Sequence, residues 1–259
     1  MQEFMRGLSL HSQLHTEGWC PTTPDVLKVA ADVAKGMHYL HTAFDKPVIH
    51  RDLKSGNLML VRPPAEGAEV EVKITDFGLT RGARAADEST AASTIAGPAG
   101  TVLWMAPELL LGEEYTEKVD VFSYAMCLVE LVHRNLPWHQ SGVSQHVIPG
   151  LVTQGKRPDK QLPEHPALRQ LIVECWAGDP AHRPAFADVI RLVEAASCEG
   201  ANGSLVLVAE ATGPLGHSRP ASPDSAESSH PATEQGDMRG SATSGRSSQR
   251  KSTRNQLLA

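Results

Sequence analysis

The stretch VIHRDLKSGNLML, residues 48–60, carries three chemically different polar groups within six positions: the carboxylate of Asp52, the ammonium of Lys54 and the amide of Asn57. A carboxylate can accept the proton of a hydroxyl group, and a lysine can neutralise a phosphate. An amide oxygen suits a hard cation such as Mg²⁺. A second carboxylate, Asp76, follows further along the chain. The set indicates phosphoryl transfer, although either carboxylate taken alone is more often a surface group or a helix cap.

Three short motifs occur in a fixed order along the chain. H-R-D-x-x-x-x-N occupies positions 50–57, D-F-G occupies 76–78 and A-P-E occupies 106–108. Together they resemble the C-terminal lobe of eukaryotic protein kinases. The resemblance extends over about residues 2–196. It implies an α+β, mainly helical fold, namely a kinase-like large lobe with a short β-hairpin beside the catalytic loop.

The resemblance implies a role for each polar residue of the site. Asp52 is expected to accept the proton of the substrate hydroxyl, and Lys54 to place a positive charge on the transferring phosphate. Asn57 and Asp76 are the expected Mg²⁺ ligands, and Asp76 binds the ion that bridges the phosphates. The expected cofactors are therefore ATP and Mg²⁺.

The first residues, MQEFMRGLSLHSQL, are similar to the kinase hinge and the first helix of the large lobe. Glu3 and Met5 are expected to offer backbone groups to adenine, and Met59 to form the floor of its pocket. Ser9 is expected to cap the helix, while Leu8 stands where the family commonly has glycine.

The 259 residues contain no G-x-G-x-x-G sequence, which kinases use to cover the ATP phosphates. Lys28 lies in a predicted helix after the hinge, so it is not the strand lysine of the kinase small lobe. We therefore expect that the small lobe is absent from this chain and that the chain alone is weakly active or inactive. A non-catalytic binding module is the alternative function, although the catalytic loop keeps all of its polar residues.

The subgroup follows from HRDLKSGN, GTVLWMAPE and C-W-x-x-D-P-x-x-R-P-x-F, which together resemble the tyrosine-kinase-like group. That group mostly phosphorylates Ser and Thr of proteins, so a protein substrate is expected. An upstream or partner kinase is expected to act on the hydroxyl-rich segment 80–101. Arg51 could then pair with the added phosphate and order this segment.

Four residues have expected structural roles. Asp120 lies within an apolar helix, and a buried carboxylate needs hydrogen-bond donors. We therefore expect Asp120 to accept backbone N–H groups, and the resemblance implies that these N–H groups belong to the catalytic loop. The resemblance also implies a buried ion pair between Glu108 and Arg183. It places the Thr101 hydroxyl against the catalytic carboxylate and Lys54.

Two groups of histidines receive a structural interpretation. His38 and His41 are three residues apart on a predicted helix, but no cysteine lies near them in sequence, so they do not predict a metal site. His50 is expected to pack on Phe77 rather than to act as a base.

The apolar pattern predicts the elements that position the site. They are a helix at 22–42, strands at 57–61 and 70–75, a buried helix at 116–133, and helices at about 166–177 and 184–196. Thr23 and Thr116 are the expected N-caps of the first and the buried helix. The strands should form a hairpin with a long tip.

Composition limits the remaining possibilities. Hydrophobic residues make up 41% of the chain, enough for a core, and a net charge of −6 gives no reason to expect a nucleic-acid partner. We predict a kinase domain at 1–198 and a disordered Ser/Pro/Arg-rich tail at 199–259. The basic end of the tail is either a solvated segment or a nuclear-import or phosphorylation segment.

The four cysteines have no C-x-x-C spacing, and the chain has no membrane-length apolar run and no signal peptide. A cytoplasmic protein without a membrane span is expected, with the nucleus as a second possibility.

Overall fold

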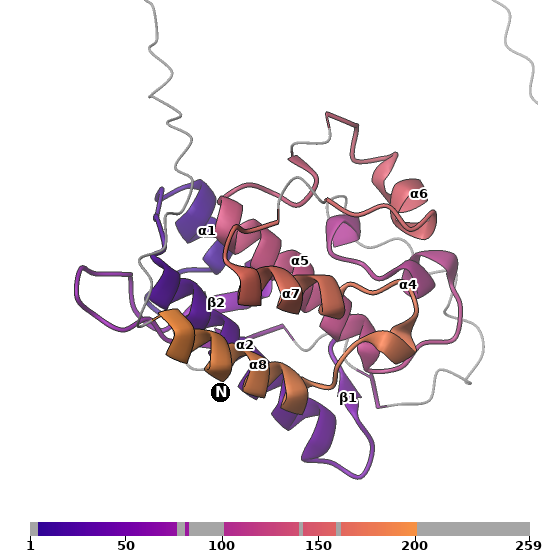
Figure 1. The fold of residues 1–259 in the computed structure, drawn as a ribbon, viewed down its shortest axis with the longest axis horizontal. Coiled ribbons are helices and arrows are strands. Elements are labelled where there is room, and N and C mark those ends of the chain that lie inside the picture. The colour runs from indigo at the N-terminus through magenta and orange to yellow at the C-terminus, as the bar shows by residue number, and fades with distance from the viewer. Residues whose placement is uncertain (1–4, 77–80, 83–100, 140–141, 159–161, 201–259) are drawn as a thin grey trace, which may run out of the picture. The chain divides into compact units, whose positions relative to one another are not determined.

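The computed structural model describes residues 5–76, 81–82, 101–139, 142–158 and 162–200, and these form a mainly helical assembly with two small two-stranded sheets (Figure 1). Its longer helices are α2 (Thr23–Thr42), α5 (Lys118–His133), α7 (Pro166–Cys175) and α8 (Phe186–Gly200). The mainly helical α+β prediction is confirmed for this part of the chain.

Helix α5 is the centre of the core. Its side chains are buried on nearly every side, and those of Phe122 and Tyr124 are fully buried. The helix packs against α2 and α7, and the Tyr124 hydroxyl donates to the carbonyl oxygen of Ala30 in α2 at 3.0 Å. The predicted buried helix is confirmed. It begins at Lys118 with Glu117 as its N-cap, so the prediction of Thr116 as N-cap is wrong, although the Thr116 hydroxyl accepts the Lys118 N–H at 3.4 Å.

Helix α2 packs against α8 with the apolar face that the sequence predicted. Its N-cap is Thr22 rather than Thr23. Thr22 and Asp25 form a capping box, in which the Thr22 N–H donates to the Asp25 carboxylate at 2.8 Å and the Asp25 N–H donates to the Thr22 hydroxyl at 3.4 Å. This reciprocal pair satisfies two N–H groups, which explains why the N-cap is one residue earlier than predicted.

Strands β2 (Leu58–Leu60) and β3 (Val72–Ile74) form the predicted antiparallel hairpin, with Leu58 opposite Ile74 and Leu60 opposite Val72. The residues between the strands form a long tip, as expected. A second pair was not predicted: β1 (Val48–Ile49) pairs antiparallel with β4 (Arg81–Gly82).

Strand β4 lies inside the hydroxyl-rich segment 80–101, which has little apolar periodicity and gave no signal for a strand. Residues 80 and 83–100 lie outside the described part of the chain. The predicted disordered tail also lies outside it, except for its first two residues, which extend α8 to Gly200.

The chain before α1 (Leu10–His15) runs beside β2. The N–H of Gly7 donates to the carbonyl of Leu60 at 3.1 Å, and the N–H of Leu60 donates to the carbonyl of Leu8 at 2.9 Å. Ser9 caps α1, as predicted, by accepting the N–H of Ser12 at 3.1 Å. A Cβ atom at Gly7 would lie only 2.4 Å from the Leu60 carbonyl oxygen, so this close approach requires glycine.

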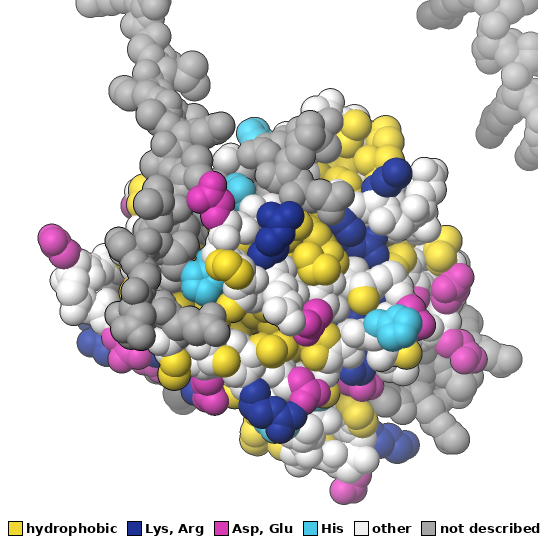
Figure 2. Space-filling model, in the orientation of Figure 1, with side chains coloured by type: hydrophobic (Ala, Val, Ile, Leu, Met, Phe, Trp, Pro, Cys, Tyr) yellow, Lys and Arg dark blue, Asp and Glu magenta, His cyan; other side chains and the backbone are white. Residues whose placement is uncertain are grey.

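The remaining elements are short and were not predicted: η1 (Ser55–Asn57), η3 (Thr101–Leu103), α4 (Pro107–Leu111), α6 (Ile148–Thr153) and η6 (Pro180–His182). Hydrophobic side chains gather in the region of α6 (Figure 2), where the exposed Val147 immediately precedes the helix and the exposed Val143 lies earlier in the same segment. None of the described helices has the length and apolar character needed to cross a membrane.

Candidate functional site

The loop between β1 and β2 brings three of the predicted site residues into direct contact. The ammonium Nζ of Lys54 donates to both oxygens of the Asp52 carboxylate, at 3.0 and 2.8 Å. The amide Nδ2 of Asn57 donates to the Asp52 carboxylate at 3.0 Å and to the Asp52 backbone carbonyl at 2.7 Å. The Asp52 carboxylate is therefore buried in this loop between the ammonium group of Lys54 and the amide group of Asn57.

The orientation of Asn57 fits a role as a cation ligand. Both of its contacts with Asp52 use the nitrogen atom, so the amide oxygen Oδ1 is the atom available to bind a cation. Lys54 also donates to the hydroxyl of Thr101 at 3.1 Å, which is one of the two contacts expected for Thr101.

Asp76 lies at the end of the hairpin next to this loop. It follows Thr75, whose N–H donates to the carbonyl of Asn57 at 2.9 Å and whose carbonyl accepts from His50 Nε2 at 3.0 Å. These bonds tie the residue before Asp76 to both ends of the catalytic loop. Asp76 is exposed and has a φ of 63°, in the left-handed region that non-glycine residues rarely occupy.

His50 has a structural role in the loop. A carbonyl only accepts, so the bond to Thr75 requires a proton on Nε2, and His50 Nδ1 then accepts the Asp52 N–H at 3.3 Å. The ring therefore connects the hairpin to the catalytic loop. Phe77, on which His50 was expected to pack, lies outside the described residues.

Asp120 of α5 braces the start of the catalytic loop, as predicted. Its fully buried carboxylate accepts the backbone N–H groups of His50 at 2.9 Å and Arg51 at 2.8 Å. His41 Nε2 supplies a third contact at 2.9 Å. The sequence did not predict this role for His41, because 79 positions separate it from Asp120.

The residues expected near adenine lie at the segment that runs beside β2. Met59 is half-buried in β2 and forms an isolated bridge with Ser9. Met5 is also half-buried and precedes Arg6, whose N–H donates to the carbonyl of Val61 at 3.3 Å. Glu3 lies outside the described residues.

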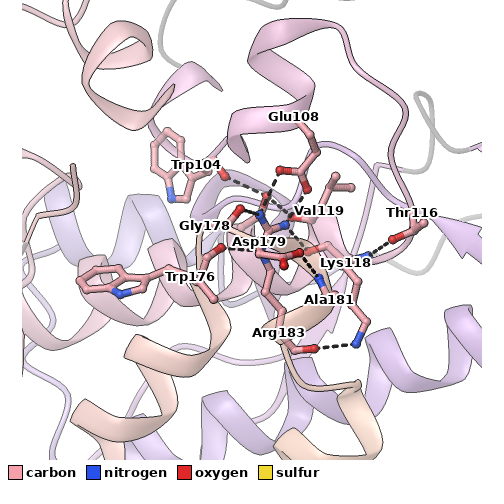
Figure 3. Close-up of polar contacts among 12 residues, drawn as sticks. Trp104, Glu108, Thr116, Lys118, Val119, Trp176, Gly178, Asp179, Ala181 and Arg183 are labelled. Carbon is pink, nitrogen blue, oxygen red and sulfur yellow. Dashed lines mark hydrogen bonds and ion pairs between the residues drawn. The ribbon is translucent and has the colours of Figure 1, made fainter. Parts of the chain in front are cut away.

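Glu108 and Arg183 form the predicted buried ion pair (Figure 3). The guanidinium Nη1 and Nη2 atoms donate to the two oxygens of Glu108 at 2.6 and 3.0 Å. The same guanidinium also donates to the backbone carbonyls of Lys118, Ala177 and Gly178. The pair joins α4, the start of α5 and the segment before α8.

A second carboxylate of α5, Glu130, was missed by the sequence reasoning. It is fully buried and accepts hydrogen bonds from the Ser55 hydroxyl at 2.7 Å, His15 Nε2 at 2.8 Å and the Trp104 indole N–H at 3.1 Å. Burial alone would raise the pKa of Glu130, but hydrogen bonds from His11, His15 and Ser55 outweigh it and hold this pKa below its ordinary value.

The signal for Glu130 was present in the sequence. Like Asp120, it is a carboxylate inside an otherwise apolar helix, and a buried carboxylate at this position also needs hydrogen-bond donors. Glu130 connects α1 and the catalytic loop to the segment that follows η3.

Comparison with known proteins identifies the family of this chain. Residues 1–193 match the family model described as "Protein tyrosine and serine/threonine kinase". The chain is 39% identical over 191 residues to serine/threonine-protein kinase STY17 of Arabidopsis thaliana, covering 74% of this chain and 31% of that protein. It is 41% identical over 197 residues to probable serine/threonine-protein kinase drkC of Dictyostelium discoideum, covering 75% of this chain and 25% of that protein.

A third relative, serine/threonine/tyrosine-protein kinase HT1 of Arabidopsis thaliana, is 37% identical over 169 residues, covering 65% of this chain and 39% of HT1. The chain thus spans between a quarter and two fifths of the length of these relatives. The family match covers most of the chain and includes the catalytic loop, the hairpin and the buried ion pair. The chain belongs to the protein tyrosine and serine/threonine kinase family.

Proposed function

We propose that this chain carries the catalytic loop and substrate side of an ATP-dependent protein kinase that phosphorylates Ser and Thr hydroxyls. The observation that carries the proposal is the contact of Asp52 with both Lys54 and Asn57 in one buried loop. Family membership and relatives named serine/threonine-protein kinases support the choice of reaction.

Each residue has a defined task in this proposal. The Asp52 carboxylate accepts the proton of the substrate hydroxyl and orients its oxygen toward the phosphorus atom. Lys54 lies within hydrogen-bond distance of that carboxylate, so it can also contact a phosphate placed beside it. Its charge offsets the negative charge of the phosphate during transfer.

The metal ligands in this proposal are the Oδ1 atom of Asn57 and the carboxylate of Asp76. Oxygen ligands of this kind suit Mg²⁺, which when bound neutralises phosphate charge. The chain positions these ligands through Thr75, which bonds to the Asn57 carbonyl. Met5, Met59 and the unplaced Glu3 remain the proposed adenine contacts.

The proposal includes a dependence on a glycine-rich lobe. The 259 residues contain no G-x-G-x-x-G, so the phosphates of ATP would lack one backbone cradle and be reached by water, which weakens the remaining charge interactions. We propose that these residues turn over ATP only slowly unless such a lobe is supplied by the same or another polypeptide.

Regulation through segment 80–101 is supported by Arg51. The Nη1 atom of Arg51 contacts the Tyr115 hydroxyl at 3.3 Å, and its Nε atom is buried without a hydrogen-bond acceptor among the described residues. A buried donor without an acceptor is costly. A phosphate placed on segment 80–101 by another kinase would supply that acceptor. We propose that this phosphorylation takes place in the cytoplasm or the nucleus.

Binding of Mg²⁺-ATP tests the proposed site without requiring turnover. At a ligand concentration of ten times Kd the folded state gains about 1.4 kcal/mol, which corresponds to roughly 3–6 °C in melting temperature for a domain of this size. We expect Asp76→Asn to abolish this shift. The matched control Asp45→Asn, at another exposed aspartate, should keep it.

Asp52→Asn tests the catalytic step. If a glycine-rich lobe is present, Asp52→Asn should abolish phosphate transfer to Ser- and Thr-containing protein while the Mg²⁺-ATP melting shift persists. Equal shifts for Asp76→Asn and Asp45→Asn would contradict the proposed metal ligand. With a glycine-rich lobe supplied, a melting shift without phosphate transfer in the wild-type protein would favour a nucleotide-binding module over an enzyme.

A further inference from the structure

We propose that His11, His15 and Glu130 form a binding site for one divalent transition-metal ion, with Zn²⁺ as the best-fitting ion. One possible ligand atom from each residue lies within 4.8 Å of the other two. This cluster lies on α1 and α5 and shares no residue with the proposed Mg²⁺ ligands Asn57 and Asp76. The proposal therefore does not depend on the kinase activity proposed above.

The sequence spacing puts both histidine rings on the same side of α1. His11 and His15 are four residues apart, and their ring centroids are 4.5 Å apart. Both rings lie against the same carboxylate oxygen: Glu130 Oε1 is 2.8 Å from His15 Nε2 and 3.5 Å from His11 Nδ1. Two imidazole nitrogens and one carboxylate oxygen thus lie close enough together to bind one ion.

The ligand set matches zinc chemistry. Zn²⁺ binds imidazole nitrogen and carboxylate oxygen at about 2.0–2.2 Å, and two histidines with one glutamate are a known three-ligand set that leaves a fourth position for water. The side chains of His11 and His15 are 45% and 20% exposed, whereas that of Glu130 is fully buried. An ion can therefore enter from the histidine side, where the fourth position would face solvent.

The carboxylate is held in place by groups that would not bind the metal. Ser55 donates to Oε1 at 2.7 Å, and the Trp104 indole N–H donates to Oε2 at 3.1 Å. Such outer hydrogen bonds fix the orientation of a ligand and strengthen metal binding. A pair of histidines on an exposed helix without this support would bind metal poorly.

The nitrogen ligands also select the class of ion. Imidazole favours zinc, copper and nickel, while magnesium and calcium prefer sites made entirely of oxygen. A site with two nitrogen ligands should therefore bind Zn²⁺ and leave Mg²⁺ in solution. This difference separates the cluster from the ATP-linked Mg²⁺ site in the same experiment.

The test is a titration of the full 259-residue chain, stripped with a chelator and exchanged into chelator-free buffer. Isothermal calorimetry with ZnCl₂ should show one zinc ion bound per wild-type chain at this site, and Mg²⁺ at the same concentrations should give no heat there. We expect His11→Ala and His15→Ala each to weaken zinc binding at least tenfold. The control His146→Ala, at an exposed histidine outside the cluster, should bind like the wild type.

A second measurement covers the case in which a variant fails to fold. Co²⁺ bound to the wild-type chain should give the intense visible bands of a four-coordinate ion, and one equivalent of Zn²⁺ should displace it. Circular dichroism of His11→Ala in chelator should match the wild type, since this side chain is partly exposed. Absence of these bands, or zinc binding that neither histidine substitution weakens, would overturn the proposal.

Discussion

The buried ion pair between Glu108 and Arg183 allows a quantitative test of how the fold is held together. Glu108→Gln keeps the shape of the side chain but removes its charge. The Arg183 residue is only 1% exposed, so its guanidinium cannot regain solvation in the folded state. The substitution therefore leaves a buried positive charge without its counter-ion.

The expected loss follows from the contacts that remain. Removing one partner of a buried pair costs about 3–5 kcal/mol. Arg183 keeps the backbone carbonyls of Lys118, Ala177 and Gly178, and the amide oxygen of glutamine can still accept one N–H group. We therefore expect about 3 kcal/mol, the lower end of that range. For a domain of this size this is roughly 6–12 °C in melting temperature.

Thermal and urea unfolding, followed by circular dichroism, would measure the change in the free energy of unfolding. Asp188→Asn is the matched control, because Asp188 forms an exposed ion pair with Arg191 one helical turn away and should lose little stability. If Glu108→Gln melts as close to the wild-type temperature as Asp188→Asn does, the expected cost of leaving Arg183 without its counter-ion is wrong. The double variant Glu108→Leu/Arg183→Met should be less destabilised than Glu108→Gln, because it leaves no buried charge.

Two further predictions concern the backbone and the thiols. Leu8 has a φ of 62° and is 44% exposed, so Leu8→Gly should relieve backbone strain with little loss of buried area. We expect it to raise the free energy of unfolding by about 1 kcal/mol in urea titrations. Gly18 has a φ of 71°, so Gly18→Ala should lower the free energy of unfolding. A loss of stability in Leu8→Gly would contradict this. Burial raises the pKa of the Cys127 and Cys175 thiols, so a thiol reagent should label two cysteines per native chain and four after unfolding. A third fast-reacting thiol in the native chain would contradict the burial of Cys127 and Cys175.

The elements that could be predicted from the sequence are those whose signal is local and long. Helix α2 repeats its apolar residues over five turns, and α5 is apolar on nearly every side, so periodicity alone identifies both. The hairpin was found because Pro, Gly and charged residues separate two β-prone segments. The polar residues of the catalytic loop were found because they lie within six positions of one another.

The features that were missed depend on contacts between distant segments. Strands β1 and β4 have two residues each, too few for an alternating pattern, and only their pairing defines them. The N-cap of α2 is the exception, because Asp25 lies only three residues after Thr22 and the spacing of a capping box was therefore present in the sequence. His15 and Ser55 lie 115 and 75 positions from Glu130, so no local pattern could connect them.

The two carboxylates of α5 explain how a short, irregular loop can hold a defined geometry. Asp120 fixes the backbone at residues 50 and 51, and Glu130 fixes Ser55. At 1.5 Å per residue these carboxylates are about 15 Å apart along the helix axis, so one buried helix anchors the loop on either side of Asp52. Because close packing keeps α5 rigid, the core fixes the backbone on both sides of Asp52, and Lys54 and Asn57 then orient its carboxylate. The loop can therefore vary in its exposed residues while the position of its central carboxylate is preserved.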